Sequence, residues 1–242
     1  MPNPIYAVGD IHGQFHQLER ALDLVAADGG SDAQIVFLGD LVDRGPDSRA
    51  VIDRLKQGQD SGQPWHVLKG NHDRMFSRFL QSGDETDPRI LSGLGWLHTR
   101  LGGLTTLASY GVSDDPDMPA PDRWQAARAA VPQSHFDYID QLPLWFERDD
   151  LLFVHAGILP GFDLPLQTED DLIWIRAPFL DYPHPHPWLI VHGHTALDHP
   201  QHFGNRIDLD GGTGYGRPLH PAVFEGHDCW LLTDDGRQPL TP

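Results

Sequence analysis

The sequence predicts an α/β protein, and three observations carry that prediction. The chain has 242 residues, of which 39% are hydrophobic, so residues 1–242 are long enough and apolar enough to form a single domain with one substantial core. Short apolar runs bounded by glycine alternate with stretches of helical periodicity, a pattern typical of βαβ units and a partly parallel sheet. Five of these runs end in polar clusters, where such sheets bind their ligands.

Three of the predicted strands lie in the N-terminal third of the chain, at residues 5–8, 35–38 and 65–68. Each is short, rich in β-branched or aromatic residues and followed by a stretch of helical period. The apolar residues that share one helical face are Phe15, Leu18, Leu22 and Val25, then Val51, Ile52 and Leu55, then Met75, Phe76, Phe79 and Leu80. We therefore expect strand and helix to alternate through this third.

The middle of the chain, from about 83 to 143, differs in composition. It contains the pair Gly102-Gly103 and a stretch rich in Pro and Asp at 114–119, which predicts helices and loops that cap a site. Two further buried strands are predicted at 151–154 and 189–191. C-terminal strands at 206–210, 222–224 and 230–232 are expected to form a second sheet.

The polar clusters contain the residue types that bind transition metals. They are Asp-x-His at 10–12, Gly-Asp-x-x-Asp-Arg-Gly at 39–45, Gly-Asn-His at 70–72, and the later His155 and His194. Carboxylate and amide oxygens together with imidazole suit Mn, Fe, Zn or Ni, whereas an all-oxygen Ca²⁺ site needs no histidine. One carboxylate can bridge two ions about 3.5–4 Å apart. We expect two divalent ions, Mn first, with Fe, Zn or Ni as alternatives.

These motifs resemble those of the calcineurin-like metallophosphoesterases, and most of all their phosphoprotein phosphatase branch with its bacterial and phage serine/threonine protein phosphatases. The resemblance covers nearly the whole chain, at 9–13, 39–45, 70–73, 103–111, 155–157, 172–176 and 193–195. It implies two mixed β-sheets packed as a sandwich flanked by helices, an α/β/β/α arrangement. It also implies a dinuclear metal site at the carboxyl ends of the strands.

The resemblance implies which residues bind the metals. The first ion takes Asp10, His12 and the bridging Asp40, and the second takes Asp40, Asn71, His155 and His194. Many metallophosphoesterases have a further histidine where this chain has Ala196, and its absence favours the phosphoprotein phosphatase branch. His192 precedes Gly193 and is not expected to be a ligand. Asp73 stands where that branch usually has glutamate.

The same resemblance gives the remaining groups their expected roles. Arg44 and Arg176 are expected to bind the phosphate oxygens, because a planar guanidinium donates two parallel hydrogen bonds to such oxygens. His72 faces the leaving group as general acid, and Asp43 orients His72 and raises its proton affinity. A hydroxide that bridges the metals attacks the phosphorus in line. Tyr215, on a Gly-rich loop, borders the substrate pocket.

Composition restricts the partners. The formal net charge of −18 predicts repulsion from nucleic acids and anionic membranes, and no run of Lys or Arg opposes it. Cys229 is the single cysteine, which excludes an internal disulfide and a thiolate metal cluster. The first residues do not resemble a secretory signal, and no apolar stretch approaches about 18 residues. We expect a cytoplasmic protein, with a monomer as the default.

The expected activity is metal-dependent hydrolysis of phosphate monoesters, with a phosphoprotein or a small phosphomonoester as the substrate. The leading interpretation is a serine/threonine protein phosphatase, which can also act on phosphotyrosine. The alternative is a symmetrical dinucleoside tetraphosphate hydrolase, which resembles the same branch. From another class, the chain could be a catalytically silent metal-binding regulatory module. That reading predicts the loss of some ligands or of His72, and none is lost.

Overall fold

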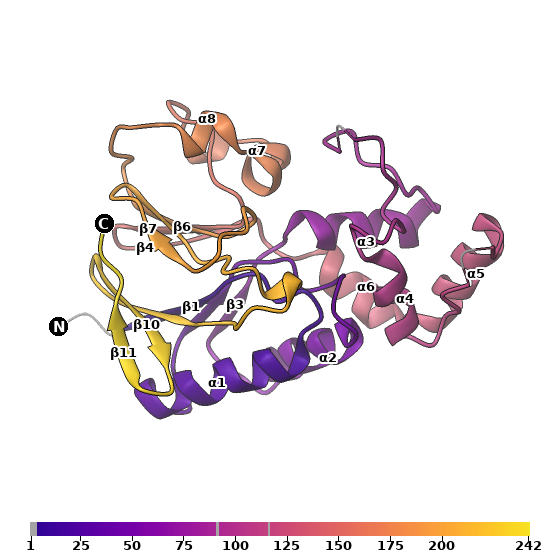
Figure 1. The fold of residues 1–242 in the computed structure, drawn as a ribbon, viewed down its shortest axis with the longest axis horizontal. Helices are drawn as coiled ribbons and strands as arrows, with labels where there is room; N and C mark the ends of the chain where they lie inside the picture. Colours follow the sequence, from indigo (N-terminus) through magenta and orange to yellow (C-terminus); the bar gives the residue numbers. More distant parts are fainter. Residues whose placement is uncertain (1–3, 91, 116) are drawn as a thin grey trace.

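Two β-sheets face each other in the left-hand part of the molecule as drawn in Figure 1, with helices on their outer faces. The computed structural model describes residues 4–90, 92–115 and 117–242. The first sheet has the order β11 (Gly236–Pro239), β10 (Asp228–Thr233), β9 (Ala222–Glu225), β1 (Ile5–Val8), β2 (Ile35–Phe37) and β3 (Trp65–Val67). The second has the order β4 (Trp145–Arg148), β5 (Leu151–Val154), β6 (Leu189–His192), β8 (Arg206–Asp208) and β7 (Gln201–His202).

Eight α-helices are described, and the first three of them follow β1, β2 and β3, as the periodicity predicts. They are α1 (Phe15–Gly29), α2 (Ser48–Asp60), α3 (Asn71–Ser82), α4 (Gly103–Ser109), α5 (Ala120–Ala130), α6 (Gln133–Asp140), α7 (Glu169–Trp174) and α8 (Ala177–Leu180). Two 3₁₀ turns, η1 (Leu164–Leu166) and η2 (Thr213–Tyr215), complete the described elements. In the described ranges no helix combines the length and the apolar character needed to cross a membrane.

Alternation along the strands builds the layers. In β1, Tyr6 and Val8 join the apolar cluster under the outer helices, whereas Ile5 and Ala7 point into the cluster between the sheets. In β5, Phe153 points into that same inner cluster. Successive side chains of a strand point to opposite faces, so a strand that is apolar at every position is covered on both sides. The expected sandwich of two mixed sheets flanked by helices is confirmed.

The assignment of strands to sheets was partly wrong. The C-terminal strands do not form a sheet of their own: β9 pairs antiparallel with β1 in the first sheet, and β8 pairs parallel with β6 in the second. The strands β5 and β6, which we predicted as buried strands, lie in the second sheet together with β8. Periodicity shows which residues are covered but not which strand is the neighbour, and pairing with β9 leaves the edge of β1 protected.

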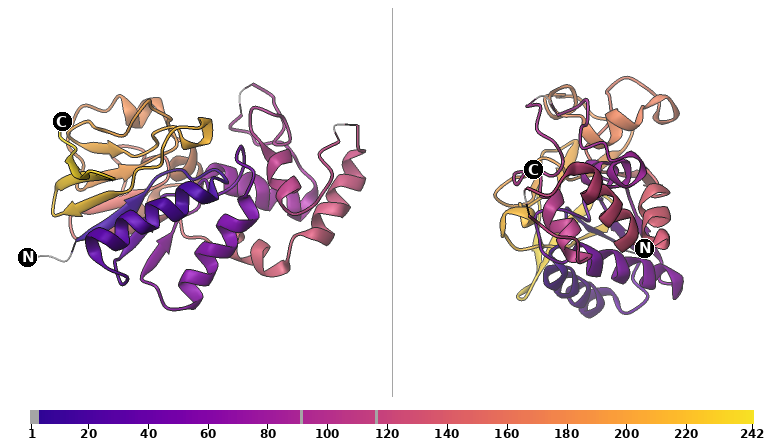
Figure 2. Two further views of the ribbon diagram at one scale, coloured as in Figure 1. Left: turned by 60° about the horizontal axis from the view of Figure 1, so that its bottom comes forward. Right: turned by 90° about the vertical axis from the view of Figure 1, so that its right-hand side faces the viewer.

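We expected residues 83–143 to cap the site, and the described residues of this range form a helical lobe beside the sandwich (Figure 2). Its helix α4 packs against α2, and its helices α5 and α6 pack against α3. The lobe therefore rests on the helix that begins at Asn71, at the polar end of the first sheet.

Candidate active site

The loops that follow the strands of both sheets are joined by backbone hydrogen bonds at one edge of the sandwich. The amide of His12, after β1, donates to the carbonyl of Asp40, after β2, at 2.8 Å. In the second sheet, the amide of Gly193 donates to the carbonyl of His155 at 2.8 Å. The amide of His194 donates to Oδ1 of Asp10 at 3.1 Å and thereby connects the two sheets. The polar clusters between Asp10 and His194 therefore lie close together at this edge, as we expected.

The first of two ligand groups gathers around the side chain of Asn71. Its Oδ1 lies 2.8 Å from Nδ1 of His194 and 3.0 Å from Nε2 of His155. The Oδ1 atom of Asp40 lies 3.4 Å from that same Nε2. All four residues are buried.

The second group lies on the other side of Asp40. Its Oδ2 atom is 3.5 Å from Nε2 of His12, and Asp10 approaches the same Nε2 to 3.9 Å. The two carboxylate oxygens of Asp40 therefore face two different groups of nitrogen and oxygen atoms. This is the arrangement that a bridging ligand requires.

Hydrogen bonds on the far side of two imidazoles orient them. Nδ1 of His12 lies 2.9 Å from the carbonyl of Val42, and Nδ1 of His155 lies 2.8 Å from that of Leu38. Since a carbonyl only accepts, each Nδ1 carries the proton and each Nε2 lone pair points inward. Burial lowers the pKa of His12, His155 and His194, so these rings are neutral and able to bind a metal.

Buried carboxylates lie close together at the same edge. Burial raises the pKa of Asp10, and the charges of Asp210 and Asp40 raise it further. Burial also raises the pKa of Asp208, and that of Asp210 to about 6. Divalent cations would offset this repulsion, so the residues present fit the expected pair of ions. Asp208 and Asp210 were missed as site residues because we interpreted 206–210 only as a strand. Two acidic residues at the end of a buried strand could have indicated that they belong to the site.

A buried hydrogen-bond chain holds His72. Its Nδ1 lies 2.6 Å from Oδ2 of Asp43. The same Oδ2 accepts from the indole Nε1 of Trp96 at 2.7 Å, and Oδ1 accepts from the hydroxyl of Thr106 at 2.6 Å. Both donors come from the 83–143 lobe, and sequence reasoning missed them. No local pattern relates Trp96 to Asp43, which is 53 residues away.

The two predicted phosphate-gripping arginines differ in their surroundings. Nη1 of Arg44 contacts Nε2 of His12, and Nη2 lies 3.1 Å from Nε2 of His72. Arg176 is exposed and donates to the hydroxyl of Thr195 at 3.2 Å. Within the described ranges no hydrogen bond joins Arg176 to another predicted site residue. Thr195 directly follows His194 in the chain, so the hydrogen bond to Thr195 places Arg176 beside the same site.

Tyr215 lies next to Arg44, because the Gly-rich loop approaches the metal ligands closely. The Arg44 guanidinium carbon is 4.8 Å from the centre of the Tyr215 ring. A Cβ atom on Gly214 would come within 2.6 Å of Cδ2 of His12, so only glycine allows this approach. The tyrosine is 62% exposed and borders the mouth of the site.

Unusual backbone conformations concentrate at this edge. Six described residues other than glycine have positive φ, and five of them are predicted site residues: His12, Asp40, Asp43, Arg44 and His194. Such conformations cost roughly 1–3 kcal/mol each and persist where the surrounding structure imposes them. The strain points to a functional site on grounds independent of residue chemistry.

Asp73 and His192 lie next to the site but are not among its expected metal ligands. The carboxylate of Asp73 accepts from the amides of Gly70 at 2.8 Å and Leu41 at 3.0 Å, and so joins the start of α3 to the loop after β2. His192 is buried, with Nε2 3.2 Å from the Arg206 guanidinium, and lies outside both ligand groups, as we expected.

The chain is similar to curated proteins that are named bis(5′-nucleosyl)-tetraphosphatases. The chain is 35% identical over 158 residues, 64% of its length and 44% of the other, to a symmetrical bis(5′-nucleosyl)-tetraphosphatase of Janthinobacterium sp.. It is 24% identical over 258 residues, 96% of its length and 94% of the other, to the asymmetrical bis(5′-nucleosyl)-tetraphosphatase PrpE of Halalkalibacterium halodurans. The chain spans about half the length of the first curated relatives that it matches.

Among solved structures, a protein provisionally described as a diadenosine tetraphosphatase superposes with a TM-score of 0.64 at 24% identity, over 99% of this chain and 94% of the other. At that identity the likeness shows a shared fold. The sequence model of the calcineurin-like phosphoesterases matches residues 3–230. With that match over nearly the whole chain, the protein belongs to the calcineurin-like phosphoesterases, a family of metal-dependent hydrolases.

Proposed function

We propose that this protein hydrolyses bis(5′-nucleosyl) polyphosphates at a phosphoanhydride bond. The observation that carries the proposal is the pair of relatives described above, one at 35% identity and one matched over nearly its whole length, which both bear the name bis(5′-nucleosyl)-tetraphosphatase. These names favour the alternative in our sequence interpretation over the serine/threonine protein phosphatase that we placed first.

The ligand groups divide around Asp40. Asp10, His12 and Asp40 would hold one divalent ion, and Asp40, Asn71, His155 and His194 the other. When bound, such a pair offsets the charge of the phosphate oxygens and lowers the pKa of a water molecule to near 7. Mn²⁺ is the ion that we propose first, because the donor set mixes imidazole with carboxylate and amide oxygens.

The protein's own groups would position the substrate and manage the leaving group. Arg44 and Arg176 would bind the non-bridging oxygens of the phosphate that is attacked. Water adds to that phosphorus as the bridging P–O bond breaks, and the departing phosphate keeps the bridging oxygen. Asp43 accepts a hydrogen bond from Nδ1 of His72. In its doubly protonated form, His72 would give the proton on Nε2 to that oxygen and then remain as the neutral imidazole.

A protein phosphatase is the competing proposal. The observations in its favour are Ala196, in place of a further histidine, and the Trp174-x-Arg176 stretch, both of which resemble the phosphoprotein phosphatase branch. The two proposals share the metal ligands and the proton donor. They differ in what surrounds the scissile phosphate.

Parallel assays would separate these proposals. The Mn-loaded protein is offered diadenosine tetraphosphate, a panel of phosphopeptides and a phosphodiester, and the products are separated by anion-exchange chromatography. We expect kcat/KM for the dinucleotide to exceed that for every phosphopeptide by at least tenfold. If diadenosine tetraphosphate yields ADP as the single product, cleavage is symmetrical. If it yields AMP and ATP, cleavage is asymmetrical. Preference for a phosphopeptide would overturn the proposal, and no turnover of any substrate would favour a silent metal-binding module.

A further inference from the structure

A cavity of about 500 Å³ opens directly beside the proposed phosphate site. One wall is the Gly-rich loop with Gly214 and Tyr215, and another is Arg44. The third wall comes from the 83–143 lobe and consists of Ser92, Leu94, Thr99, Arg100 and Leu101. Because Arg44 belongs to both the cavity and the site, a substrate with its phosphate at the metals could extend into this space.

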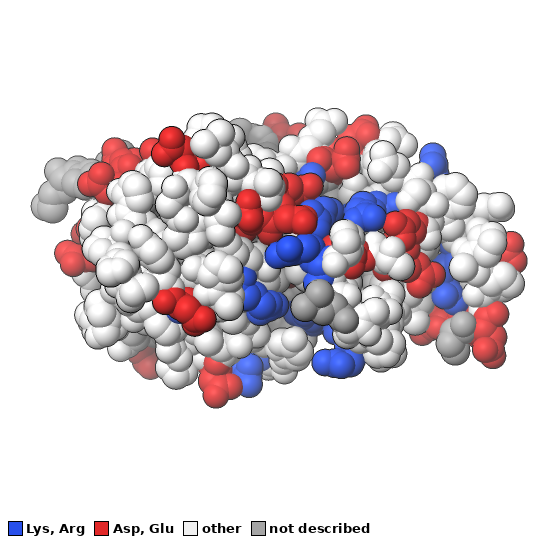
Figure 3. Space-filling model, turned by 90° about the horizontal axis from the view of Figure 1, so that it is seen from above, with Lys and Arg blue, Asp and Glu red and all other residues white. Residues whose placement is uncertain are grey.

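The charge of the cavity is opposite to that of the protein as a whole. Among the described residues no acidic side chain lines it, although Asp and Glu outnumber Lys and Arg by 35 to 17 in the sequence. In the described part of the chain, ten Arg and Lys side chains form ion pairs with carboxylates. Arg44 and Arg100 form none there. In the view from above, Lys and Arg side chains gather near the middle of the face that is shown, with Asp and Glu side chains beside them (Figure 3).

The segment that carries Arg100 is fixed against the catalytic residues. A Cβ atom on Gly102, which has φ of 94°, would overlap the backbone nitrogen of Arg44. Four residues before Arg100, Trp96 donates to the carboxylate of Asp43. The position of the Arg100 backbone is therefore coupled to the site, while its side chain is exposed.

The opposite wall offers a flat aromatic surface. The Tyr215 ring is 62% exposed and lies 4.8 Å from the Arg44 guanidinium carbon. A guanidinium beside an exposed ring suits a ligand that joins phosphate to an aromatic group, since phosphate pairs with arginine and a base stacks on tyrosine.

We propose that this cavity binds the part of the substrate beyond the scissile phosphate, with Arg100 holding the next phosphate and Tyr215 stacking on the nucleobase. The proposal rests on the proposed function, because only a substrate of the nucleoside polyphosphate class carries both groups. Arg100 and Tyr215 are then specificity-determining residues. The metal ligands and His72 act on any phosphoester.

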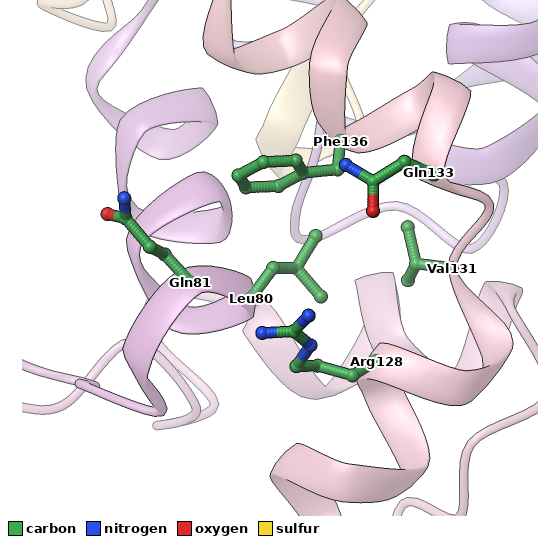
Figure 4. Close-up of a pocket in the computed structure, with 6 residues that line it drawn as sticks. All are labelled: Leu80, Gln81, Arg128, Val131, Gln133 and Phe136. Carbon is green, nitrogen blue, oxygen red and sulfur yellow. The ribbon is translucent and has the colours of Figure 1, made fainter.

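The chain offers a matched control for Arg100. Arg128 on α5 is also an exposed arginine of the lobe without a carboxylate partner in the described ranges, and it faces a separate cavity of about 200 Å³ (Figure 4). That cavity is lined by Leu80, Gln81, Arg128, Val131, Gln133 and Phe136. Leu80 lies about 13 Å along α3 from Asn71. Removal of Arg128 therefore changes the same charge away from the site.

Calorimetric titration of the Mn-loaded protein tests the proposal with binding affinity, and not turnover, as its readout. The probes are orthophosphate, pyrophosphate and ADP, which present one phosphate, two phosphates, and two phosphates with a base. For Arg100→Ala we expect the affinity for pyrophosphate and ADP to fall about tenfold relative to that for orthophosphate, as for the loss of a charged hydrogen bond. For Tyr215→Ala we expect the affinity for ADP to fall about fivefold relative to that for pyrophosphate. Arg128→Ala should keep all ratios within twofold of the wild type.

Two outcomes would overturn the proposal. One is an Arg100→Ala protein whose affinity ratios match those of the wild type, and the other is an equal loss in Arg128→Ala. Arg100→Gln, which keeps most of the side-chain length, repeats the test if the alanine variant fails to fold. Hydrolysis of diadenosine tetraphosphate is measured separately. A wild type that prefers ADP over orthophosphate but leaves the dinucleotide intact would contradict the proposed function and not the binding cavity.

Discussion

The edge of the sandwich and the 83–143 lobe contribute to the same site in different ways. The strand ends supply the groups that can bind metal, each within a few residues of a short motif such as Asp10-x-His12. The lobe supplies residues to which the sequence analysis gave no role: Trp96 and Thr106 support Asp43, and Arg100 lines the adjoining cavity. In our proposals the sandwich would carry the chemistry, whereas the lobe would position the proton donor His72 and contribute to the choice of substrate.

The largest effect is expected at the carboxylate shared by both ligand groups. Asp40→Asn should reduce turnover far more than the roughly 10–100-fold typical of losing a partner of a metal ligand, because both ions lose an anionic bridge. Metal content measured by atomic absorption should fall from two ions per chain. Asp53→Asn, an exposed acid on α2, is the matched control. If the Asp40→Asn variant keeps full activity and two bound ions, the proposal that Asp40 bridges the ions is wrong.

A smaller loss is expected when the proton donor alone is removed. His72→Asn should lower kcat by about 10²–10⁴-fold and leave the metal content unchanged, because general acid catalysis contributes that range and His72 is not among the proposed ligands. The loss should shrink for substrates with a better leaving group, such as an activated aryl phosphate. If metal is lost in parallel with activity, His72 is a ligand and our division of roles is wrong.

A still smaller effect tests the contribution of the lobe. Trp96→Phe keeps the buried ring but removes one donor to Asp43, which costs about 1–3 kcal/mol when a buried acceptor loses its partner. We expect kcat to fall about tenfold with KM little changed, because His72 is less well held. Trp124→Phe, whose indole donates to the carbonyl of Leu80, is the control. Equal kinetics in the two variants would make Trp96 purely structural.

The smallest effect concerns the interior between the sheets. Burial raises the pKa of the Cys229 thiol to about 12. A folded-state value above the ordinary 9.0 means that the thiolate is absent from pH 7 to 9, and burial also blocks access. Ellman's reagent at pH 8 should therefore modify Cys229 only after denaturant unfolds the protein. Rapid reaction in the native state would show that the sandwich opens locally.

Much of the site could be predicted because its residues are close together in sequence. Asp10 with His12, Asp43 with Arg44, and Asn71 with His72 each follow a short apolar strand, and parallel strands bring their carboxyl ends to one edge. The two-sheet arrangement itself came from the family resemblance and is confirmed. The roles assigned to these residues remain predictions that the variants above would test.

The sequence by itself determined the strands, the helices that follow them and the ligand types, because periodicity and local motifs act over a few residues. Only the tertiary structure decided that β9 returns to pair with β1, that Trp96 and Thr106 support Asp43, and that Arg100 faces the same cavity as Tyr215. These contacts join residues tens to hundreds of positions apart. They depend on packing between layers, which no local pattern records.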